Sequence, residues 1–76
     1  MIHSVVLIEG KDLTKEALMF SLSNAKQIVM GRVSGSGDWL VQITATKLAD
    51  LEKALLKYAK VPGMTGVVTL LIRTQS

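Results

Sequence analysis

Aliphatic and β-branched residues cluster in four short segments of this 76-residue chain, and their spacing predicts β-strands. The segments are residues 2–9, 27–33, 39–45 and 67–73. In the third segment one side of a strand would carry Trp39, Val41, Ile43 and Ala45, which alternate with a second set of side chains. Residues 34–38 read Ser-Gly-Ser-Gly-Asp, and two glycines in five residues predict a tight turn. The second and third strands should therefore form a hairpin.

Two further segments carry helical patterns. In residues 47–60 the apolar side chains recur at a spacing of 3.6, with polar side chains opposite, and form a stripe of Leu48, Leu51, Leu55, Tyr58 and Ala59. Residues 13–23 are mostly good helix formers and follow Asp12, a candidate N-cap, so a first helix is predicted there. Its apolar residues lie on more than one face, which predicts contact with more than one neighbour.

The predicted order of strand, helix, strand, strand, helix and strand is that of the ferredoxin-like βαββαβ fold, an α+β class. Such a fold places two helices on one face of a four-stranded antiparallel sheet. In a lone domain the second face should be polar, yet residues 2–9 and 67–73 carry aliphatic side chains on both faces. We therefore expect that face to pack on another sheet, which gives a dimeric α+β barrel.

Composition restricts what else could stabilise so small a chain. There is no cysteine and only one histidine, His3, which excludes disulfides, thiolate zinc sites and histidine-rich metal sites. Apolar residues make up 49% of the chain and charged residues 20%, so oligomerisation is the expected support. The apolar runs are too short to cross a membrane and the N-terminus lacks a signal-peptide pattern, so we expect a cytoplasmic protein without membrane contact.

Groups able to carry out chemistry are sparse. No serine or threonine pairs with His3 in a recognisable nucleophile pattern, and the six acidic residues show no paired spacing. A net charge of +3 and three aromatic residues offer little for nucleic acids, although Lys53, Lys57 and Lys60 share one helical stripe, which is either solvated or a phosphate contact. We expect no catalytic residues, no metal, no cofactor and no direct DNA binding.

Four short motifs resemble the effector domain of the Lrp/AsnC family of transcription regulators. Residues 33–38, followed by an aliphatic strand, are similar to the family's V-T-G-x-Y-D loop, and residues 48–52 to its D-L-x-x-L-E helix start. Residues 61–64 resemble its I-P-G-V, and residues 67–70 fall where the family has T-x-T. Two positions depart from the pattern: Gly37 replaces an aromatic residue, and Val67 replaces a threonine.

This resemblance implies that residues 1–76 form a single stand-alone RAM domain (regulator of amino-acid metabolism), an ACT-like module, without the helix-turn-helix of full regulators. In that family the domain dimerises sheet to sheet, and dimers build higher oligomers such as octamers. Free amino acids bind between dimers beside the hairpin loop. Mixed assembly with full-length Lrp/AsnC regulators is a further implied partnership.

The glycine-rich turn has groups that suit an amino acid. Its backbone amides can approach a carboxylate, Asp38 can pair with an ammonium group, and Thr69 can add a hydrogen bond. The candidate ligand-binding residues are Ser34, Gly35, Ser36, Gly37, Asp38, Trp39 and Thr69. The alternative is a plain turn in which Asp38 binds its own loop amides.

The leading hypothesis is a non-enzymatic regulatory module that binds amino acids. Two alternatives stay open. One is a cofactor-free enzyme whose cleft lies between helices and sheet, with His3, Trp39 and Tyr58 as its candidate polar groups. The other is a pure assembly module without a small ligand.

Overall fold

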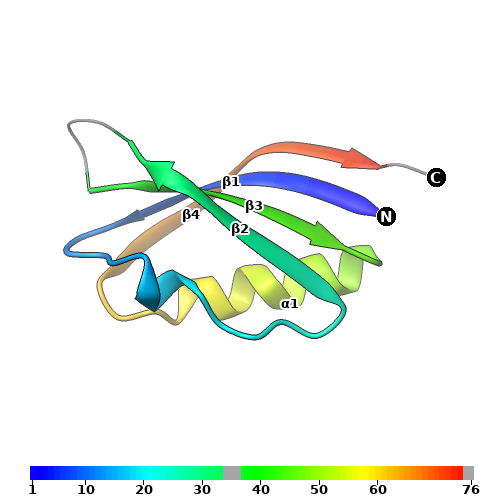
Figure 1. Ribbon diagram of the computed structural model, residues 1–76, viewed down its shortest axis with the longest axis horizontal. Helices are drawn as coiled ribbons and strands as arrows, with labels where there is room; N and C mark the ends of the chain where they lie inside the picture. The colour runs from blue at the N-terminus through cyan, green and yellow to red at the C-terminus, as the bar shows by residue number, and fades with distance from the viewer. Residues whose placement is uncertain (34–36, 75–76) are drawn as a thin grey trace.

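The computed structural model describes residues 1–33 and 37–74 and has an α+β architecture, with an antiparallel sheet on one layer and a helix on the other (Figure 1). Its elements are, in chain order, β1 (Ile2–Gly10), the 3₁₀ turn η1 (Glu16–Leu18), β2 (Ala25–Arg32), β3 (Trp39–Ala45), α1 (Leu48–Ala59) and β4 (Met64–Thr74). The four strands, the hairpin and the second predicted helix are thus confirmed, with element ends that differ by at most three residues from the predicted ones.

The sheet has the strand order β2-β3-β1-β4, and all three pairings are antiparallel. This order is compatible with a ferredoxin-like fold. The central strand β1 pairs with β3 from Ile2 opposite Ala45 to Ile8 opposite Trp39. The register shifts once in the β2–β3 pairing, between Val29 and Gly31. It shifts twice in the β1–β4 pairing, between Val5 and Val6 and between Glu9 and Gly10.

The hydrophobic core lies between α1 and one face of the sheet. Alternate residues of β1 and β3 point into it, and the fully buried ones include Val6, Ile8, Val41 and Ile43. From α1 the buried residues are Asp50, Leu51, Ala54 and Tyr58, so Leu51 and Tyr58 of the predicted stripe are buried. Leu55 is half-buried, Leu48 and Ala59 are exposed, and Ala54 takes a core position that the stripe did not include. After Lys60 the chain turns at Pro62 and at Gly63, whose φ of 88° favours glycine.

The predicted helix over residues 13–23 is wrong. The segment contains only η1, and the chain otherwise runs irregularly beneath β2 and β3 until it reaches Asn24. Asp12 adopts a φ of 57°, whereas an N-cap residue is extended, so the expected cap does not form. The two buried side chains, Leu13 and Leu18, are five positions apart, which on an α-helix separates them by about 140°. An irregular path buries both against one sheet, and a helix does not.

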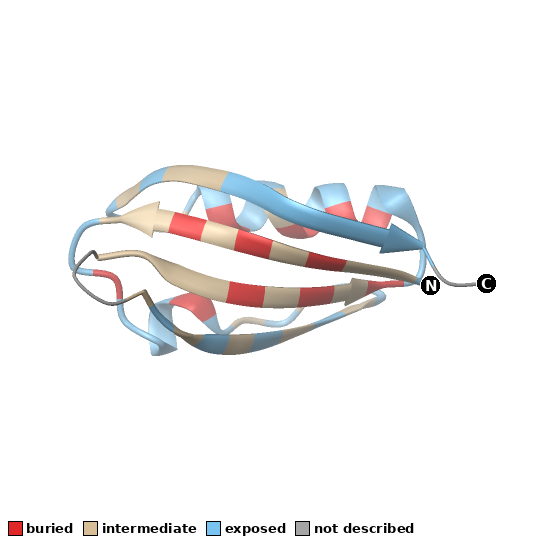
Figure 2. Cartoon of the chain, turned by 90° about the horizontal axis from the view of Figure 1, so that it is seen from above, coloured by how far each residue is buried: buried red, intermediate tan, exposed pale blue. Residues whose placement is uncertain are grey.

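The other face of the sheet is open in a single copy, and Figure 2 looks directly onto it. Because Ser4, Val6 and Ile8 point into the core, their neighbours along β1 point the opposite way. Register then places the remaining residues of this open face on the other three strands: Lys26, Ile28, Leu40, Gln42, Thr44, Val68, Leu71 and Arg73. No described segment covers them, so the expected second face is present, and the predicted dimer stays a prediction.

Candidate functional site

The β2–β3 hairpin, the predicted ligand site, lies at the end of the sheet next to Gly10. The amide of Val33 donates to the carbonyl of Asp38 with an N···O distance of 2.8 Å and closes the hairpin. A Cβ on Gly37 would lie 2.8 Å from the carbonyl oxygen of Gly10, so the hairpin packs tightly on the end of β1. This close approach favours glycine at position 37, because a larger side chain would meet the backbone of β1. Ser34, Gly35 and Ser36 lie outside the described residues.

Trp39 lies beside the hairpin but points to the helix side of the sheet. Its indole Nε1 donates to the carbonyl of Leu13 at 3.3 Å, and the guanidinium carbon of Arg32 lies 5.8 Å from the ring centroid. These contacts join the β1–η1 connection to the start of β3, and the second is a cation–π interaction. Trp39 is therefore a structural link at the hairpin end.

Thr69 does not meet the hairpin within one copy. It is an exposed residue of the edge strand β4 and lies opposite Val6, near the middle of the sheet. The hairpin leaves β3 beyond the level of Ile8, and β1 lies between β3 and β4. The structure thus gathers Gly37, Asp38 and Trp39 at one end and leaves Thr69 apart.

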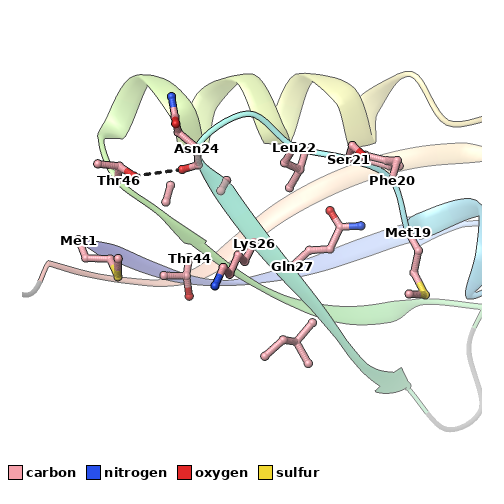
Figure 3. Close-up of a pocket in the computed structure, with 13 residues that line it drawn as sticks. Met1, Met19, Phe20, Ser21, Leu22, Asn24, Lys26, Gln27, Thr44 and Thr46 are labelled. Atoms are coloured by element: carbon pink, nitrogen blue, oxygen red, sulfur yellow. Dashed lines mark hydrogen bonds between the residues drawn. The ribbon is translucent and has the colours of Figure 1, made fainter.

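A hollow lies elsewhere, along β2, and has a volume of about 1060 Å³ (Figure 3). One wall is the irregular segment of residues 19–24, and the other is formed by β2 and the end of β3. Its apolar lining includes Met1, Met19, Phe20, Leu22 and Ile28, and its polar lining includes Lys26, Gln27 and Thr44. Sequence reasoning missed this groove because it assigned residues 19–23 to a helix. One feature of the sequence could have indicated it: the apolar residues of this segment do not lie on a single helical face.

Polar side chains near the groove hold the irregular segment in place. Both Gln27 Nε2 and the hydroxyl of Tyr58 donate to the carbonyl of Leu18, each at 3.0 Å, and the ammonium of Lys57 donates to the carbonyl of Ser21 at 2.8 Å. Lys57, which the sequence places on a charged outer stripe, therefore has a structural partner. In a helix these carbonyls would accept hydrogen bonds from backbone amides. Here side chains donate to them instead, and we infer that these hydrogen bonds hold the segment in its irregular conformation.

The three candidate groups for an enzyme do not converge. Burial raises the pKa of Tyr58 to about 12, so its hydroxyl stays protonated at neutral pH and acts as a donor in the core. His3 lies on the opposite face of the sheet, where its Nδ1 is 3.2 Å from Oγ1 of Thr44. Trp39 is at the far end of the strands from His3. The geometry thus provides no shared cleft for these three side chains.

No protein-family model, curated protein or solved structure matches this chain. Within residues 1–33 and 37–74, no helix is long and apolar enough to cross a membrane. Across the same residues, no three histidine, aspartate or glutamate side chains come close enough to hold a metal ion.

Proposed function

We propose that this chain is a non-enzymatic binding module that dimerises through its open sheet face and binds a free amino acid at the hairpin end. The observation that carries the proposal is the open face itself. Its two central cross-strand rows are mainly aliphatic and contain Ile28, Val5, Leu71, Leu40, Leu7 and Val68, with Gln42 as their polar member. A contiguous apolar patch of this kind is typical of an interface rather than of solvated surface.

The size of the face supports a second copy as its occupant. The molecule measures 36 × 20 × 17 Å, and its layers stack along the intermediate direction in Figure 1. A face of 36 × 17 Å covers roughly 600 Å², so two copies packed face to face would bury about 1,200 Å², the lower end of the range for stable interfaces. In such a packing each sheet covers the apolar side chains on the open face of the other sheet. The helix does not cover these side chains, because it lies on the opposite face.

The hairpin end supplies the groups for the ligand. Gly37 packs closely on Gly10, and the carbonyl of Asp38 accepts a hydrogen bond from the amide of Val33, so both residues have backbone contacts at this end of the sheet. A carboxylate such as that of Asp38 is the natural partner for the ammonium of an amino acid, and backbone amides suit its carboxylate. Modulation of full-length Lrp/AsnC regulators by mixed assembly is the role that the sequence resemblance adds.

Thermal denaturation with each of the twenty amino acids tests the ligand part of the proposal. At a concentration of one hundred times Kd, a bound amino acid should stabilise the fold by about 2.7 kcal/mol and raise Tm by several degrees. The Asp38→Asn variant should bind the same amino acid roughly 10- to 150-fold more weakly, because one charge-assisted hydrogen bond is lost.

Asp12→Asn is the matched control for that variant. Asp12 is exposed at a φ of 57°, a conformation that asparagine tolerates, so neither Tm nor affinity should change. If no amino acid shifts Tm at millimolar concentration, the ligand part of the proposal is wrong and the chain is an assembly module alone.

A further inference from the structure

The charged residues of the open face are sorted to its two ends. One end is a cross-strand row in which Lys26, Thr44, His3 and Arg73 lie directly opposite one another on β2, β3, β1 and β4. Neighbours in such a row have Cβ atoms about 4.5–5.5 Å apart. The other end carries Glu9, six residues further along β1 and therefore about 20 Å away. The two aliphatic rows lie between these ends.

Glu9 reaches across to the edge strand. It lies opposite Gly66 on β4, and its Oε1 is 2.8 Å from the position that a Cβ on Gly66 would occupy. Because glycine has no side chain, the carboxylate can lie over β4 at this level. The carboxylate of Glu9, which extends from β1, therefore lies over β4 at one end of the face. Arg73, a residue of β4, lies at the other end.

We propose that the two copies pack with their strands antiparallel, about a twofold axis that runs across the strands, so that Glu9 of each copy pairs with the partner's Arg73. This inference rests on the dimer of the proposed function and adds its orientation. A face-to-face dimer has its twofold axis in the plane of the interface. An axis parallel to the strands sets the row of Lys26 and Arg73 against the same row of the partner, and like charges that meet at an interface are strongly unfavourable.

An axis across the strands removes that conflict and matches the remaining rows. It reverses the direction of the strands but leaves β4 over β4, so Arg73 faces the level of Gly66, where Glu9 of the partner subunit lies. The row with Val5 and Leu71 then packs on the row with the partner's Leu7 and the partner's Val68. On β4 the positive Arg73 then meets the negative Glu9 of the partner subunit, and apolar rows meet apolar rows.

A charge exchange measures the proposed pair. In the full chain at low salt, Glu9→Arg and Arg73→Glu should each raise the dimer Kd about tenfold, because symmetry breaks two ion pairs at once. The double variant should return within about threefold of the parent, and added salt should reduce all the differences. Lys53→Glu on the exposed face of α1 is the control and should leave Kd unchanged.

Cross-linking measures the orientation independently of the pair's strength. Because the chain has no cysteine, Glu9→Cys and Arg73→Cys each provide a unique thiol. A mixture of the two variants treated with a short bismaleimide should yield the heterodimer between them. A mixture of Arg73→Cys with Lys26→Cys should yield little product, whereas an axis along the strands would set these two positions opposite each other and cross-link them.

The outcomes separate this inference from the dimer proposal. A parent chain that is monomeric at every concentration contradicts the dimer itself. If the parent is dimeric, three results would overturn the orientation alone: the double charge variant is not restored, Arg73→Cys cross-links to Lys26→Cys, or Glu9→Cys and Arg73→Cys give no heterodimer. Far-UV circular dichroism of each variant verifies that it is folded before its Kd is interpreted.

Discussion

Replacing Leu71 by lysine is expected to convert the dimer into a folded monomer. Leu71 lies opposite Val5 in a central row of the open face, where the second copy covers it in the proposed dimer. Lysine at this position would place an unpaired ammonium in an apolar interface, which typically costs 3–5 kcal/mol and so raises Kd at least about 100-fold. Size-exclusion chromatography with light scattering over a dilution series measures the change.

Leu56→Lys is the control that separates interface from surface. Leu56 is 62% exposed on the outer side of α1, and Leu71 is 57% exposed on the sheet, so the two leucines are equally accessible in a single copy. Only Leu71 should matter for association. Equal behaviour of the two variants, whether both dimeric or both monomeric, would contradict an interface on the open face.

Replacing Leu18 by alanine is expected to destabilise the fold by about 2–5 kcal/mol, the usual cost of deleting a fully buried leucine side chain. Leu18 has no exposed surface, and its carbonyl accepts hydrogen bonds from both Tyr58 and Gln27. In a domain of this size each kcal/mol lowers Tm by roughly 4–8 °C, so the loss should exceed about 8 °C. Chemical denaturation followed by circular dichroism gives the free energy directly.

Met19→Ala tests whether the irregular path of this segment is correct. Met19 is the next residue along the chain and is 56% exposed, so its truncation should change stability by less than about 0.5 kcal/mol. In a helix over residues 13–23 with Leu13, Ala17 and Phe20 facing the core, Leu18 would not be buried more deeply than Met19. Its truncation would then cost no more stability than that of Met19. Similar losses for both variants would therefore argue against the observed path.

The strands and α1 could be predicted from sequence because their patterns are local. Residues 39–45 alternate cleanly, and β3 has those bounds in the structure. Leu51 and Tyr58 of the predicted stripe face the core as expected, whereas Leu48 and Ala59 at its two ends are exposed. β4 extends from Met64 to Thr74, beyond the predicted residues 67–73, because pairing with β1 continues to Gly10 and to Ile2.

The segment between β1 and β2 could not be predicted from helix propensity. Good helix formers such as Ala17 and Leu18 are weak evidence when burial demands a different spacing, and here Leu13 and Leu18 both reach the sheet. The groove along β2 depends on that path, so it was missed as well. At the hairpin, the turn was predictable, and strand alternation already places Trp39 on the side of Val41 and Ile43. The hydrogen bond of its indole to the carbonyl of Leu13 was not predictable, because it joins residues that are 26 positions apart.

Sedimentation equilibrium of the unmodified chain over nanomolar to micromolar concentrations tests the central claim most directly. The account predicts a folded species of twice the chain mass of 8.2 kDa at micromolar concentration, dissociating on dilution. A monodisperse species of 8.2 kDa that keeps its circular dichroism spectrum and a cooperative melting transition at micromolar concentration would contradict it.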